Sequence, residues 1–180
     1  MKSFTLSEIE KLFKIPQHVL IHLCEKQVVI PEIQQSTGRG NFRRFSEDNI
    51  FGFAVALELK KYQIPLAVIK ALLIVLSATC KKISSSTKIE SLISNFRHLQ
   101  ADLYIFEGTY IALEFTSIHD NRQASNSEKS RIFGIDLSGL LKKEHPSINL
   151  DHHSKLPESY ASYLKVGLSD IASCISSQVQ

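Results

Sequence analysis

The order of elements in the first 80 residues constrains this chain most: two short helices, a glycine-containing basic turn, then two longer helices. Leu6–Phe13 and Pro16–Lys26 carry apolar residues at helical spacing. Only a few residues separate the two segments, which is typical of a helix-turn-helix unit. The pattern therefore predicts a first helix that supports a second, with one side of the second helix left free.

A basic hairpin, or wing, is predicted after the second helix. Val28–Ile30 is expected to form a short strand, and Gln34–Asn41 is a turn cluster with two glycines. Phe42–Phe45 alternates apolar and basic residues, as a strand buried on one face does. We expect Phe42 and Phe45 to anchor this hairpin to the core, which leaves its arginines outside.

Seven side chains are candidate contacts for duplex DNA. A helix fits the major groove, which is about 12 Å wide, and cations beside the groove bind phosphates. Periodicity places three of the seven on the free side of the second helix, and the other four belong to the hairpin. They are Gln17, His18, His22, Arg39, Asn41, Arg43 and Arg44. The alternatives are a solvated charged hairpin and, for His22, a partly buried surface histidine.

Two helices complete the first half. Ser46 is a capping residue for a helix over Asp48–Tyr62, and Pro65 opens another over Leu66–Cys80. Lys81–Thr87 is expected to be a linker, so we place a boundary between residues 80 and 81. The second of these helices is apolar on all sides, which favours a dimer interface; the alternative is the core of its own domain. The residues expected at that interface, on this helix and on the one after the linker, are Leu72, Leu73, Val75, Leu76, Ile89, Leu92, Ile93 and Phe96.

The second half, residues 81–180, mixes strands and helices. A turn at Glu107–Thr109 predicts a hairpin, and polar residues 117–130 predict a loop. The expected strands are Leu103–Phe106, Tyr110–Phe115 and Arg131–Leu137. The expected helices are Ile89–Gln100 and Pro157–Ser176, with a helical turn in Ser138–Lys143 and an irregular segment over His145–Leu156. We expect this module to serve dimerisation or to bind an effector.

Charge is divided unevenly along the chain. Up to Lys82 there are 12 Lys and Arg against 7 Asp and Glu, and from Ile83 onward 9 against 11. A basic first half beside a mildly acidic second half suggests a module for a polyanion joined to something else. No apolar stretch approaches the roughly 20 residues of a membrane span, and the three cysteines are scattered. We therefore expect a reduced, cytoplasmic protein with no membrane association.

The sequence offers little support for chemistry. His152 and His153, with Asp151 and His145, lack a cysteine partner, so a polar loop is a better interpretation than a metal site. Neither a phosphate-binding loop nor a nucleophile elbow is present. We expect no metal, no cofactor and no enzymatic activity.

The first half resembles the DNA-binding domain of the MerR family of bacterial transcription regulators, over about residues 3–76. The matching segments are Phe4–Ile9, Glu25–Lys26, Val29–Pro31, Gly38–Asp48 and Tyr62–Lys70, in the family's order. The segment His22–Glu25 stands where the family usually has Arg-Tyr-Tyr-Glu.

The resemblance implies a function and partners. It implies double-stranded DNA binding with Arg39 and Arg43 at contact positions, a homodimer, promoter distortion and contact with RNA polymerase. Together with the residue patterns, it predicts an α+β protein with a winged helix-turn-helix domain followed by helices and a small antiparallel sheet. The expected function is that of a sequence-specific transcription regulator. Rival interpretations are a protein-interaction module and a plasmid or phage accessory DNA-binding factor on the same scaffold.

Overall fold

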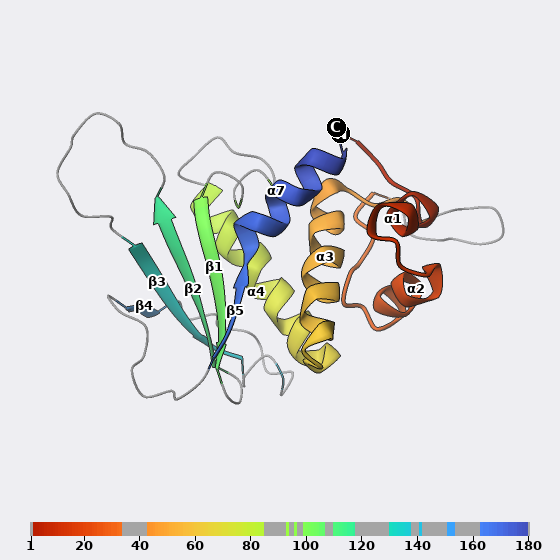
Figure 1. Ribbon diagram of the computed structural model, residues 1–180. Coiled ribbons are helices and arrows are strands. Elements are labelled where there is room, and N and C mark those ends of the chain that lie inside the picture. The colour runs from red at the N-terminus through yellow and green to blue at the C-terminus, as the bar shows by residue number, and fades with distance from the viewer. Residues whose placement is uncertain are drawn as a thin grey trace.

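The structure, a computed structural model, describes residues 2–33, 43–84, 93, 96, 99–106, 110–117, 130–137, 141, 151–153 and 163–179. Its helices are α1 (Leu6–Phe13), α2 (Gln17–Glu25), α3 (Glu47–Lys61), α4 (Leu66–Ser84) and α7 (Leu168–Val179). Its strands are β1 (Leu99–Phe106), β2 (Tyr110–Ser117), β3 (Ser130–Asp136), β4 (Asp151–His153) and β5 (Tyr163–Gly167). Helices gather at one end and the antiparallel sheet at the other, so the predicted α+β class is confirmed (Figure 1).

Local signals set the two short helices. The Thr5 hydroxyl accepts from the backbone N–H of Glu8, whose carboxylate accepts from the Thr5 N–H, so a capping box begins α1. Lys14 ends it in the left-handed conformation, with φ of 53°. Pro16 precedes α2 directly. The predicted pair of helices is confirmed.

The segment after α2 differs from its prediction. Val28–Ile30 forms no strand. Gln27 has φ of 55°, and the N–H groups of Val28 and Val29 both donate to the Leu23 carbonyl at the end of α2. These N–H groups cap the helix and are not free for a strand ladder. The apolar residues Val28 and Val29, which suggested a buried strand, are buried without forming one.

The two longer helices follow their predicted positions, with one difference. Ser46 caps α3 as expected, and its hydroxyl accepts from the N–H of Asn49 at 3.1 Å. Helix α4 continues through Ser84, so the expected linker is wrong for residues 81–84. Lysine has a high intrinsic helix propensity, so the Lys81-Lys82 pair is compatible with a continued helix. The rest of that linker lies outside the described residues.

The sheet has the strand order β4-β3-β2-β1-β5, and every pair is antiparallel. The predicted hairpin is confirmed as β1 and β2, with Leu103 opposite Leu113. The predicted third strand is confirmed as β3. Leu141 is helical, and its N–H donates to the carbonyl of Leu137, consistent with the expected helical turn.

Three predictions for the second half are wrong. Leu99 and Gln100 belong to β1 and not to the preceding helix. Asp151–His153, expected to be irregular, pairs with β3. Tyr163–Gly167, expected to be helical, forms β5 beside β1, and only then does α7 begin. The backbone of β5 pairs with that of β1, and this tertiary pairing overrides the helical pattern of the segment.

One continuous core joins the two halves. The rings of Phe51 on α3 and Phe96 stack at 5.1 Å between centroids, and those of Phe96 and Phe115 on β2 stack at 6.2 Å. Helix α7 contacts both α3 and β1 and lies between them (Figure 1). Most residues expected at a dimer interface are instead buried within one chain. They are Leu72, Val75, Leu76, Ile93 and Phe96. Among the described helices, none is long and apolar enough to cross a membrane.

Candidate nucleic-acid interface

Helix α2 turns one side to the core and the other to solvent. Leu20 and Leu23 are fully buried, whereas His18, His22 and Glu25 are exposed. Residues spaced by three or four positions share one side of a helix, so the three exposed side chains form a row along α2. Gln17, expected on the same side, is half-buried at the start of the helix.

A short backbone pairing fixes the basic segment beside the helices. Phe4 and Phe45 form an antiparallel bridge, with N–H groups donating to carbonyls in both directions at 2.9 and 3.0 Å. Phe45 is fully buried, as expected, and its ring contacts that of Phe53. Phe42 lies outside the described residues. The bridge holds Arg43 and Arg44 next to α1 and α2.

Arg43 lies against α2. Burial raises the pKa of the Cys24 thiol, and the charge of Arg43 and a hydrogen bond from its guanidinium oppose that rise. Cys24 shares an edge of α2 with Gln17 and Ile21, because these positions are separated by three and four residues. Arg43 therefore flanks the edge of α2 next to the exposed histidine row.

Arg44 lies toward α1. Its charge contributes to a lowered pKa of Glu8, behind the larger effects of hydrogen bonds from the Thr5 backbone and side chain. Both arginines are half-buried. The structure thus brings His18, His22 and Arg43 to one helix and gives Arg44 an acidic neighbour. Arg39 and Asn41 lie outside the described residues.

Cations also stand at both ends of α2. Lys14 precedes the helix and Lys26 follows it, and both side chains are exposed. Glu25 is the acidic member of this surface. The described surface around α2 therefore combines hydrogen-bonding side chains on its exposed row with positive charge at its ends and along one edge.

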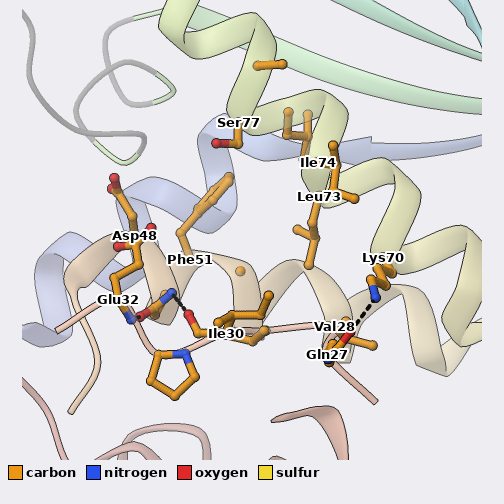
Figure 2. Close-up of a pocket in the computed structure, with 16 residues that line it drawn as sticks. Gln27, Val28, Ile30, Glu32, Asp48, Phe51, Lys70, Leu73, Ile74 and Ser77 are labelled. Carbon is orange, nitrogen blue, oxygen red and sulfur yellow. Dashed lines mark hydrogen bonds between the residues drawn. The ribbon is translucent and has the colours of Figure 1, made fainter. Parts of the chain in front are cut away.

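An apolar groove lies on another side of the helical half, and the sequence patterns did not indicate it. It has a volume of about 490 Å³ and lies between the Gln27–Glu32 segment, α3 and α4 (Figure 2). Ile30 and Ile74 are 50% and 44% exposed at the groove, and Phe51 and Gly52 are among its lining residues. Ile74 falls within the apolar stretch of α4, which was the one available signal.

A buried amide holds the groove together. Asn49 is 7% exposed, and its side-chain oxygen accepts from the N–H of Glu32 at 3.0 Å and from that of Ser46 at 3.3 Å. Its side-chain nitrogen donates to the Ile30 carbonyl at 3.0 Å. The Ser46 hydroxyl donates to the Glu32 carboxylate. This network ties the segment after α2 to the start of α3.

A second polar cluster lies on the sheet. The Tyr104 hydroxyl donates to the Glu114 carboxylate at 2.8 Å, and Lys165 pairs with Asp102 at 2.9 Å. Burial, and then the hydrogen bond to Glu114, raise the pKa of Tyr104 to about 12. With its proton held, the Tyr104 hydroxyl is a neutral donor to Glu114, so this contact between β1 and β2 stabilises the sheet.

The described residues assemble no group of three His, Cys, Asp or Glu side chains that could hold a metal ion. The backbone of Asp151–His153 belongs to β4. In comparisons with known proteins, no protein-family model and no curated protein matches the chain.

Proposed function

We propose that this protein is a sequence-specific double-stranded DNA-binding transcription regulator that acts as a homodimer. In this proposal α2 enters the major groove and the wing contacts the flanking phosphates. Base edges there present donors and acceptors that histidine and glutamine side chains can read. The DNA contacts are Gln17, His18, His22, Arg39, Asn41, Arg43 and Arg44.

One observation carries the proposal: Arg43 lies against α2, and His18 and His22 on that same helix are exposed to solvent. A cation beside a free helix face can bind a phosphate while that face meets base edges. The capping of α1 and the bridge between Phe4 and Phe45 hold these parts on a fixed frame. Such preorganisation limits the entropy lost on binding.

The test is binding to duplex DNA at two salt concentrations. We expect a labelled random-sequence duplex to shift at about 50 mM salt and to lose affinity steeply by about 200 mM, because phosphate contacts release counterions. A site selected from a randomised pool should bind at least a hundredfold more tightly. Absence of binding at low salt would contradict the proposal.

The apolar groove favours a second function, that of a module that holds another protein. Exposed isoleucines beside a hollow are typical of protein contact surfaces. Such a module would show no salt-dependent affinity for DNA, whereas an architectural accessory factor would bind DNA with little sequence preference. The same selection experiment therefore separates all three. A cytoplasmic location belongs to this proposal because the duplex is found there.

A further inference from the structure

We infer that the groove between the Gln27–Glu32 segment, α3 and α4 is the surface through which two copies of this chain associate about a two-fold axis. The inference rests on the proposed function in that the latter calls for a dimer. It adds the location of the dimer interface. The sequence had placed that interface on apolar residues that the structure mostly buries, among them Leu72, Val75 and Leu76 of α4. The charges at the two ends of the groove are opposite in sign, and they identify its occupant as a second copy of this chain.

Opposite charges stand at opposite ends of the groove. Lys70 lies at one end, where its ammonium group donates to the Gln27 amide oxygen at 3.0 Å. Glu32 lies at the other end, beyond Val28, Ile30 and Phe51 (Figure 2). Neither forms an ion pair within the described part of the chain, and Lys70 has a neutral partner.

A two-fold axis requires a self-complementary surface. An axis through the middle of the groove places Lys70 of each copy near Glu32 of the other, so two ion pairs form at once. The same rotation brings the exposed side chains of Ile30 and Ile74 from both copies together. Polar ends around an apolar centre are the usual anatomy of a protein interface. The groove fits a copy of itself better than a partner with a single sign of charge.

The size of the groove sets the expected strength. Sixteen residues line it, fewer than the roughly 20 to 30 that a standard interface has on each side. We therefore expect a reversible dimer with a dissociation constant in the micromolar range. Its position directly after α2 joins the two DNA-reading helices through a short segment, which suits a symmetric site.

Charge reversal tests the pairing. We expect sedimentation equilibrium to show the wild type dimerising at micromolar concentration. Lys70→Glu and Glu32→Lys should each weaken the homodimer roughly 10- to 30-fold, because two attractions become two repulsions. An equimolar mixture of the two variants should dimerise again, since each positive end then meets a negative end. Lys60→Glu, a half-buried lysine on α3 outside the groove, is the matched control and should dimerise as wild type does.

A substitution at an apolar position of the groove gives a second test. It is needed because Glu32→Lys also removes the hydrogen bond that the Ser46 hydroxyl donates to the Glu32 carboxylate, and so affects folding. Ile74→Asp should abolish the dimer, whereas Tyr62→Asp, which changes a comparably exposed side chain outside the groove, should not. A wild type that stays monomeric at roughly 0.1 mM would overturn the inference. So would Lys70→Glu and Ile74→Asp proteins that dimerise normally, or a mixture that fails to dimerise.

The dimer and DNA binding fail separately. A wild type that dimerises as described but does not bind duplex DNA contradicts the proposed function and leaves this interface in place. A wild type that binds duplex DNA as a monomer at every concentration contradicts this interface and the homodimer of the proposed function, and leaves DNA binding itself in place.

Discussion

The side-chain amide of Asn49 donates to the carbonyl oxygen of Ile30 at 3.0 Å, joining the start of α3 to the segment that leaves α2. We predict that Asn49→Ala lowers the free energy of unfolding by about 2–4 kcal/mol, because the buried N–H of Ser46, the part-buried N–H of Glu32 and the carbonyl of Ile30 lose their partner. Urea denaturation followed by circular dichroism measures this change. Gln27→Ala removes an exposed amide and should cost about 0.5 kcal/mol or less; equal losses would contradict the role assigned to Asn49.

The contact of Arg43 with α2 predicts a phosphate contact. Arg43→Ala should weaken binding to all duplex sequences by a similar factor and reduce the slope of log affinity against log salt by about one. Arg44→Ala should have a smaller effect, because Glu8 already offsets part of its charge. Fluorescence anisotropy over a series of salt concentrations measures both slopes. An unchanged slope for Arg43→Ala would remove this residue from the interface.

The exposed position of His22 predicts a role in sequence preference. His22→Ala should change the base preference at one or two positions of the selected site, each by about 1–3 kcal/mol of discrimination. The salt slope should change little, since a contact with a base edge displaces no counterion from a phosphate. Selection from a randomised duplex pool measures this base preference for His22→Ala, for the wild type and for His18→Ala. Identical selected sites for all three proteins would place α2 outside the groove.

The position of Phe96 between Phe51 and Phe115 predicts that the halves unfold together. Phe96→Ala should destabilise the protein by about 3–5 kcal/mol, because it leaves a cavity among buried rings. Phe96→Leu should cost less. Both variants and the wild type should show one cooperative transition, measured by calorimetry and by circular dichroism. Two separate transitions would show instead that the segments before and after residue 80 fold independently.

The raised pKa of Tyr104 predicts a loss of stability in strong base. The folded state holds this proton up to about pH 12, whereas an unfolded tyrosine loses it near pH 10. The contribution is therefore complete below pH 10 and disappears between about pH 10 and 12, by at most about 2–3 kcal/mol. Unfolding free energies measured across this range should fall more steeply for the wild type than for Tyr104→Phe. Parallel curves would show that the hydroxyl titrates normally.

The helices of the first half could be predicted because each begins at a local signal. Thr5, Pro16, Ser46 and Pro65 stand at or beside the first turns, and a capping residue acts within three positions of the chain. The row of His18 and His22 followed from periodicity alone. The contact of Arg43 with Cys24 could not, because it depends on the pairing of Phe4 with Phe45.

The strand β5 shows where local patterns become ambiguous. Leu164, Leu168 and Ile171 are spaced as on a helix, yet Leu164 and Val166 are also spaced as on a strand. The pairing of Leu103 with Val166 decides between them, and no feature near residue 166 announces it. The groove was missed for a related reason: Ile30 and Ile74 are far apart in sequence, and hydrophobicity alone does not say which isoleucine stays exposed.

The placement of β5 beside β1 has a consequence for biosynthesis. Residues 163–179 leave the ribosome after every element they contact, so β1 must wait with a bare edge and α3 with an uncovered side. Pairings between such distant segments slow folding, since a long chain loop has to close first. During translation the nascent chain therefore exposes an unpaired strand edge and an apolar helix surface, which are prone to aggregation until residues 163–179 pack against them.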